Sequence, residues 1–215
     1  MRIVFFGDSI TDFGRDRENA LIGMGQGYPL LVTASLSLSQ PGQHSFLNSG
    51  VSGNSVLDLY ARVKQDVWNK NPELLSILIG INGVWHDLEP EPYGVDAARY
   101  ETVYRMLLRE TVARFPNIRL MILEPFVLHT GATVEAWETF RAETALRAAS
   151  ARRAAEEAHA VFVPLQRIFD DACRIQPPAY WLADGVHPTP AGHQLIANEW
   201  LRAFASLRSC HNRPR

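Results

Sequence analysis

The sequence predicts a three-layer α/β/α sandwich around a central parallel sheet of five strands. Short runs of apolar and β-branched residues alternate with longer segments of helical pattern along the 215 residues. These runs lack the strict alternation of a half-exposed strand, which is typical of strands buried on both faces of a parallel sheet. Strands that alternate with helices in this way form a parallel sheet covered on both sides, as in flavodoxin-like folds.

The five strands are expected at 2–6, 45–49, 74–80, 118–125 and 160–165. Helices are expected at about 27–38, 54–69, 95–114, 134–158 and 190–207. The segment 134–158 is rich in Ala, Glu and Arg, which are strong helix formers, and its Glu–Arg pairs suit a solvated helix face. We expect a single domain over residues 1–207 and a C-terminal tail at 208–215.

Composition excludes several classes of function. The chain is 47% hydrophobic and 20% charged, which suits a globular protein with a sizeable core. Its formal net charge of -2 gives no basic surface for nucleic acid. No apolar run reaches the roughly 18–20 residues of a membrane span, and the run after Arg2 is too short for a signal-peptide core. We therefore expect a cytoplasmic protein, a longer precursor being the alternative, with no nucleic-acid or membrane partner. A closed homo-oligomer is compatible with these features.

Glycines and small polar residues follow the first three expected strands. Ligand sites of such folds lie at the carboxyl ends of the strands, so these loops are where chemistry is expected. The stretch GDS (7–9) follows the first strand, GVSGN (50–54) the second and GING (80–83) the third. Glycine lets backbone N–H groups approach a ligand closely.

Ser9 is a candidate nucleophile, with a polar turn that starts a helix as the alternative. A serine hydroxyl attacks only when an imidazole takes its proton and a carboxylate orients that imidazole. Asp184 and His187 stand three residues apart in a loop broken by Gly185, and the order Ser, Asp, His is one known for such triads. The alternative for this pair is a helix-capping aspartate beside a surface histidine.

Four segments occur together in the block order of one enzyme family: GDSIT (7–11), GVSGNS (50–55), GIN (80–82) and DGVHPTPAGH (184–193). On these motifs the chain resembles the SGNH, or GDSL, hydrolases over essentially its whole length. Its GDSITDFGR, GINGVWHD and DGVHPT are similar to those of acetylxylan-esterase-like bacterial members.

The resemblance implies a role for each matching residue. Ser9 would be the nucleophile, His187 the general base and then acid, and Asp184 the carboxylate that orients it. The backbone N–H groups of Ser9 and Gly53 and the side-chain amide of Asn82 would form the oxyanion hole. No metal or organic cofactor is implied.

One position departs from the family pattern. The third block usually reads Gly-x-Asn-Asp, whereas here Gly83 follows Asn82. The missing carboxylate is understood to support its loop, so its loss leaves the triad intact and affects the positioning of Asn82. We expect Asp at position 83 to raise or preserve turnover.

Asp8, Arg15, Trp85 and Trp181 are the candidate substrate-binding residues. Arg15 either approaches the substrate or forms a structural ion pair with Asp12. Trp85, directly after the Asn82 loop, either lines the substrate pocket or packs in the core, and Trp181 is a candidate for the opposite wall.

Two other patterns are weaker. GMGQG (23–27) does not follow a strand and lacks the rest of a phosphate-loop signature. Asp184, His187 and His193 can be drawn as a metal site, but His193 suits a packed helix position better. The two cysteines, Cys173 and Cys210, match no disulfide framework, so free thiols are expected.

These features predict a serine esterase that removes a short acyl group, expected to be acetyl, from a small acylated carbohydrate such as a xylo-oligosaccharide. A lysophospholipase or thioesterase is the alternative within the same chemistry. A non-catalytic binding protein on the same fold is the alternative outside this chemistry, and Gly83 would then be a sign that the active site has decayed.

Overall fold

Five parallel strands form one sheet in the order β2-β1-β3-β4-β5. The computed structural model describes residues 1–19 and 22–209, so Cys210 and the end of the expected tail lie outside the described part. The strands are β1 (Arg2–Gly7), β2 (Ser45–Gly50), β3 (Leu74–Leu78), β4 (Arg119–Leu123) and β5 (Val161–Val163). The predicted fold class and strand number are confirmed.

The long helices fall where the pattern places them. They are α2 (Tyr28–Ser39), α3 (Val56–Asp66), α5 (Ala97–Arg114), α6 (Trp137–Glu157) and α9 (Pro190–Ser209). The last one continues two residues beyond its expected end at 207. Three short helices were not expected: α4 (Ile81–Trp85), α7 (Gln166–Ala172) and α8 (Pro178–Trp181). A fourth, α1 (Ser9–Asp12), is the helix expected under the alternative interpretation of the GDS turn. Three 3₁₀ turns, η1 (Trp68–Lys70), η2 (His86–Leu88) and η3 (Gly131–Thr133), complete the described elements.

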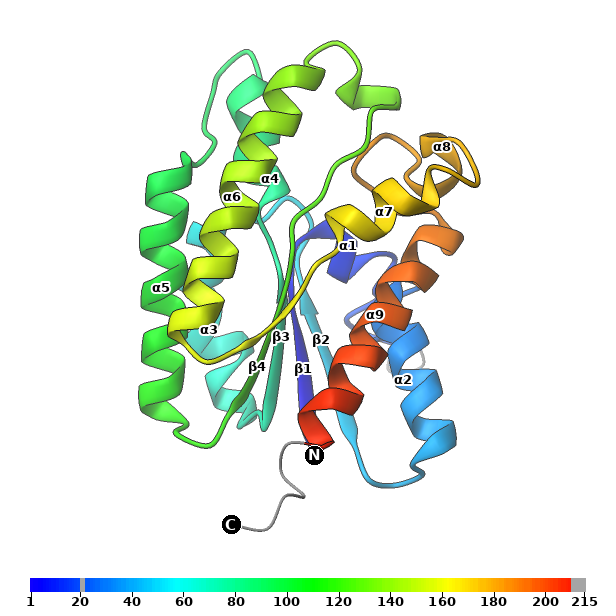
Figure 1. Cartoon of the computed structure of the whole chain (residues 1–215). Helices are drawn as coiled ribbons and strands as arrows, with labels where there is room; N and C mark the ends of the chain where they lie inside the picture. The colour runs from blue at the N-terminus through cyan, green and yellow to red at the C-terminus, as the bar shows by residue number, and fades with distance from the viewer. Residues whose placement is uncertain (20–21, 210–215) are drawn as a thin grey trace.

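The helices cover both faces of the sheet (Figure 1). Alternate residues of β1 point to opposite faces. Ile3 and Phe5 belong to the buried cluster that includes α2, α7 and α9, whereas Val4 and Phe6 belong to the cluster that includes α3, α5 and α6. Trp200 of α9 is fully buried in the first cluster. These two cores hold the sheet rigidly between its layers.

Strand order fixes where a ligand can bind. The chain leaves β1 toward β2 on one side and returns to β3 on the other, so the order reverses beside β1. At such a switch point the loops after neighbouring strands diverge and leave a crevice beyond their carboxyl ends. Gly7 at the end of β1 pairs with Gly50 of β2 and Leu78 of β3, so the three loops begin side by side.

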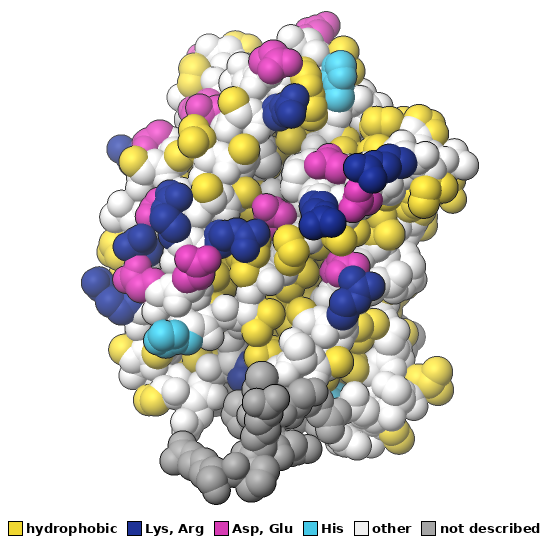
Figure 2. Space-filling view, in the orientation of Figure 1, with side chains coloured by type: hydrophobic (Ala, Val, Ile, Leu, Met, Phe, Trp, Pro, Cys, Tyr) yellow, Lys and Arg dark blue, Asp and Glu magenta, His cyan; other side chains and the backbone are white. Residues whose placement is uncertain are grey.

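The visible surface carries charges of both signs. Figure 2 shows Lys and Arg side chains interspersed with Asp and Glu over α5 and α6. In the described part of the chain, no helix is both long and apolar enough to cross a membrane.

Candidate active site

The structure brings Ser9 and His187 into hydrogen-bond contact. Ser9 is the first residue of α1, directly after β1, and the Asp8 side chain caps this helix by accepting a hydrogen bond from the Ile10 N–H at 3.0 Å. The Ser9 Oγ lies 2.9 Å from the His187 Nε2, although 178 residues separate the two along the chain. The GDSIT turn therefore both starts a helix and carries the candidate nucleophile, so the two interpretations of this stretch are compatible.

Asp184 holds the other side of the imidazole. Its Oδ2 lies 2.7 Å from the His187 Nδ1, and its Oδ1 accepts hydrogen bonds from the N–H groups of Val186 at 3.0 Å and His187 at 2.8 Å. This contact fixes the tautomer in which Nδ1 carries the proton and Nε2 is free to accept one from Ser9.

The electrostatics of the pair suit a base. Burial by itself raises the pKa of Asp184, but the hydrogen bonds from His187 and from the backbone outweigh it and bring that pKa down to about 2. The hydrogen bond with Asp184 raises the pKa of His187 above its ordinary value, against the opposing effect of burial. A more basic imidazole accepts the serine proton more readily.

A second loop fixes the Asp184–His187 loop, and sequence reasoning missed it. The segment after β4 donates from the Ala132 N–H to the Asp184 carbonyl at 3.0 Å and from the Leu128 N–H to the Gly185 carbonyl at 2.9 Å. Gly185 has a φ of +94° and lies against the Thr133 hydroxyl, where a Cβ would collide. Only glycine fits at this position. Gly185 itself is visible in the sequence, but no nearby motif indicates that Thr133 packs against it.

The expected oxyanion donors lie on three neighbouring loops. Gly53 has a φ of +79°, and the space where its Cβ would be is open. Asn82, 8% exposed, lies in α4 and donates from its Nδ2 to the Asn54 carbonyl at 2.9 Å, which ties its loop to that of Gly53. One N–H of the amide is used in this contact, and the second can serve an oxyanion.

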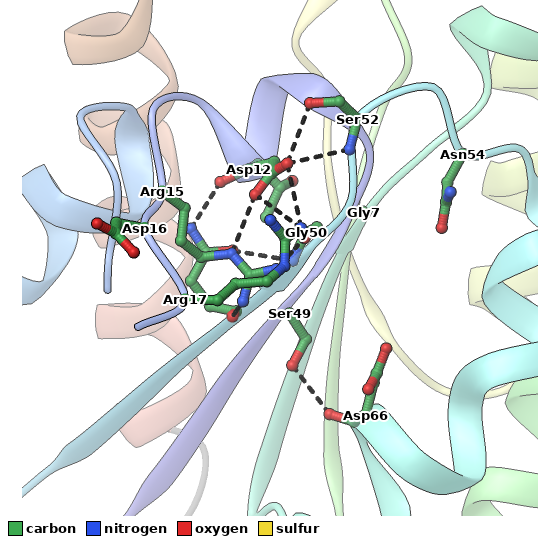
Figure 3. A network of polar contacts seen from close by, with 12 residues as sticks. Gly7, Asp12, Arg15, Asp16, Arg17, Ser49, Gly50, Ser52, Asn54 and Asp66 are labelled. Carbon is green, nitrogen blue, oxygen red and sulfur yellow. Dashed lines mark hydrogen bonds and ion pairs between the residues drawn. The ribbon is translucent and has the colours of Figure 1, made fainter. Parts of the chain in front are cut away.

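An ion-pair network around Asp12 holds Ser52, the residue before Gly53 in the chain (Figure 3). The Asp12 Oδ2 accepts hydrogen bonds from the Ser52 N–H at 3.1 Å and the Ser52 hydroxyl at 3.0 Å. Its Oδ1 pairs with the Arg15 Nε at 3.0 Å, and Arg15 also donates to the carbonyls of Asn48, at 2.6 Å, and Gly50. Arg15 is therefore engaged in the structural ion pair, and its predicted contact with substrate gains no support.

Known proteins resemble this chain over nearly its whole length. Residues 5–195 match the model of the GDSL-like lipase/acylhydrolase family. The chain belongs to this family. It is 34% identical over 217 aligned positions to an acetylxylan esterase of Geobacillus stearothermophilus, covering 97% of this chain and 96% of that protein. The family and this relative indicate a carboxylic ester hydrolase.

Solved structures of the GDSL family superpose closely. A putative GDSL-like lipase from Parabacteroides merdae has a TM-score of 0.88 at 40% identity, covering 94% of both chains. The hydrolase LAE5 from the metagenome of Lake Arreo has a TM-score of 0.84 at 33% identity, again over 94% of both chains. The G. stearothermophilus acetylxylan esterase Axe2 has a TM-score of 0.83 at 32% identity, over 94% of this chain and 93% of that one.

A buried arginine that sequence reasoning missed lies beside Gly83. Arg147 of α6 is 1% exposed and donates to the carbonyls of Val95 and, at 3.4 Å, Gly83. It pairs with Glu143 at 2.6 Å, yet its Nε has no hydrogen-bond partner in the described part of the chain. Arg147 thus occupies the space beside Gly83 and holds the loop that carries Asn82.

Asp8 is buried and Trp181 is partly buried, and both are engaged in hydrogen bonds beside the site. Asp8 is 1% exposed beneath Ser9, and burial raises its pKa to about 7 against the hydrogen bond from Ile10. Trp181 donates from its Nε1 to the carbonyls of Ala172 and Gln176, both at 3.1 Å, and its own carbonyl accepts from Thr189. Both residues therefore support the site from behind, and their predicted substrate contacts gain no support.

Trp85 lies close to His187. Its ring centroid is 6.2 Å from that of His187 and 5.7 Å from that of Phe140, and it lines a cavity of about 270 Å³. A larger cavity of about 540 Å³ is lined by Glu124, Trp137 and other residues, none of which belongs to the triad.

His193 is committed to packing. Its Nδ1 accepts a hydrogen bond from the Tyr28 N–H at 3.1 Å, and burial lowers its pKa to about 4. Its ring lies 4.6 Å from that of Phe13. Among the described residues, no three His, Cys, Asp or Glu side chains are arranged to hold a metal ion.

Proposed function

We propose that this protein removes acetyl groups from acetylated carbohydrates such as xylo-oligosaccharides, through an acyl-serine intermediate. The observation that carries the proposal is the continuous chain of contacts from Ser9 Oγ through His187 to Asp184, at 2.9 and 2.7 Å. The relative called acetylxylan esterase, and the solved Axe2 described as an acetyl-xylooligosaccharide esterase, support the substrate class.

The geometry supports a two-step reaction. Ser9 Oγ attacks the ester carbonyl as His187 Nε2 takes its proton. The N–H groups of Ser9 and Gly53 and the amide of Asn82 stabilise the negative charge on the tetrahedral oxygen. His187 then gives its proton to the leaving sugar oxygen, and the acetyl group remains on Ser9. A water molecule activated by His187 hydrolyses this intermediate and releases acetate.

The relatives support the same assignment of residues. Two solved Axe2 structures are described as catalytic mutants, one with a serine and one with an aspartate replaced by alanine. Those two positions have nearly the same separation along their chain as Ser9 and Asp184. A cytoplasmic location is part of the proposal, because two cysteines in 215 residues suit a reducing compartment.

Acetate release from acetylated xylobiose tests the proposal. The wild type is expected to release acetate, and Ser9→Ala is expected to lose about 10⁴-fold or more in kcat. Equal rates for the two proteins would overturn the acyl-serine mechanism. Measuring p-nitrophenyl acetate against the octanoate ester in parallel separates the acetyl esterase from the lysophospholipase or thioesterase, which would prefer octanoate.

A further inference from the structure

The cavity beside Trp85 carries two acidic side chains. Its volume is about 270 Å³, and Trp85, Phe140, Ala132, Glu89 and Glu135 are among the residues that line it. Trp85 belongs to α4 and Phe140 to α6, and these helices lie side by side near the top of Figure 1. The cavity thus sits at the carboxyl edge of the sheet, where the triad also lies.

The position of this cavity matches the leaving group rather than the acyl group. His187 Nε2 delivers its proton to the leaving oxygen, so that oxygen must lie next to the imidazole. Trp85, one wall of the cavity, lies beside this imidazole, with 6.2 Å between the two ring centroids. The Ala132 N–H, on the opposite element, bonds to the Asp184 carbonyl. One cavity wall therefore lies beside the imidazole that protonates the leaving group, and another is hydrogen-bonded to the backbone of the loop that carries Asp184 and His187.

The charge of the cavity is negative. Glu89 and Glu135 are exposed, and neither has an ion-pair partner within the described ranges. No Lys or Arg side chain is among the described residues that line the cavity. Carboxylates accept hydrogen bonds from hydroxyl groups, and the Trp85 ring supplies an apolar wall. The same carboxylates repel a leaving group that carries a phosphate or carboxylate.

We propose that Glu89 and Glu135 make this cavity a leaving-group site selective for neutral, hydroxyl-bearing alcohols and against anionic ones. The inference rests on the proposed function, because it assigns the cavity to the alcohol of that reaction. It separates the carbohydrate ester from a phospholipid or a phosphate-bearing thioester, whose leaving groups carry an anionic phosphate.

A matched pair of aryl esters tests the selectivity without a sugar. 4-Acetoxybenzamide and 4-acetoxybenzoate share the acetyl group and the ring, and differ in the charge of the leaving group. The quantity measured is the ratio of kcat/KM for the neutral ester to that for the anionic ester. A loss of folded enzyme cancels in this ratio, so a partly unfolded variant still gives a valid result.

The double variant Glu89→Gln, Glu135→Gln is expected to lower this ratio about five- to tenfold at low ionic strength, and less at about 1 M salt, because salt screens exposed charges. Glu138→Gln is the matched control, since Glu138 is a neighbouring exposed carboxylate that does not line the cavity. It is expected to keep the wild-type ratio.

An unchanged ratio in the double variant would overturn the inference, as would an equal shift in Glu138→Gln. The proposed function fails separately, through the absence of acetate release from acetylated xylobiose. In that case the aryl esters still report the charge preference of the cavity.

Discussion

Gly83 lies against a buried arginine, and replacing it tests how the Asn82 loop is held. A Cβ at position 83 would lie 3.2 Å from the Arg147 Nε and 3.2 Å from the Val95 carbonyl oxygen. These separations are tighter than ordinary packing, and overpacking of this kind costs about 1–3 kcal/mol. The Arg147 Nε, however, is buried and has no hydrogen-bond partner among the described residues.

Asp and Asn at this position have the same shape and differ in charge. Both Gly83→Asp and Gly83→Asn introduce the crowded Cβ, but only the aspartate places a carboxylate beside the unpaired Nε. A hydrogen bond to a charged group contributes about 1.5–3 kcal/mol. The Asn side-chain oxygen can also accept from the Nε, but only at the roughly 0.5–1.5 kcal/mol of an ordinary hydrogen bond. We therefore expect Gly83→Asp to be more stable than Gly83→Asn by about 1–1.5 kcal/mol. This corresponds to roughly 2–6 °C in Tm for a chain of this size.

Thermal and urea unfolding at pH 7 measure the difference, and p-nitrophenyl acetate hydrolysis measures its effect on Asn82. Gly83→Asp is expected to retain kcat within about tenfold of the wild type, because the loop keeps its position. If Gly83→Asn equals or exceeds Gly83→Asp in stability, Arg147 does not accept a carboxylate. A loss of more than about 100-fold in kcat would show that the loop is built for glycine.

Three further predictions concern the site. Asn82→Ala is expected to lower kcat by about 10²–10³-fold with a smaller change in KM, because one oxyanion donor is lost; steady-state kinetics with p-nitrophenyl acetate show whether it does. The raised pKa of His187 keeps its imidazole protonated to higher pH, so the acid limb of kcat/KM is expected above pH 6.5. Asp184→Asn removes the cause of that shift, and a pH series should show this limb at lower pH with kcat down about 10³–10⁴-fold. Asp12→Ala removes the carboxylate partner of the largely buried Arg15, which keeps its carbonyl acceptors at Asn48 and Gly50. A fall of about 3–5 kcal/mol in the free energy of unfolding is expected in urea titrations, because the buried guanidinium loses its counter-charge. An unchanged value would show that the network is not structural.

The layers of the fold were predictable because the signals are local. Four of the five strands are short apolar runs, whereas β2 (SFLNSG) has only two apolar side chains, and three of the first four strand segments are followed by glycines that begin a loop. β3 is shorter than expected, since the chain leaves the sheet at Leu78 even though Ile79 is also apolar and buried. The short helices α7 and α8 were missed because a few residues carry too little periodicity to indicate a helix.

The triad was predictable because its residues stand in recognisable motifs, whereas its supports were not. Arg147 reaches Gly83 from 64 residues away, and Thr133 approaches Gly185 from a loop with no motif of its own. A long-range contact of this kind leaves no spacing in the sequence. Asp8 and Trp181 have residue types that suit a substrate contact, but their hydrogen bonds to nearby backbone groups give them supporting positions, which residue type alone does not indicate.

The central claim is that Ser9 is the nucleophile activated by His187. The most direct measurement is covalent labelling with an organophosphate ester, followed by peptide mapping by mass spectrometry and by residual p-nitrophenyl acetate hydrolysis. One label per chain on Ser9, with activity lost in proportion and labelling much slower in His187→Ala, is the predicted result. A label on another residue, or full activity after Ser9 is labelled, would contradict it.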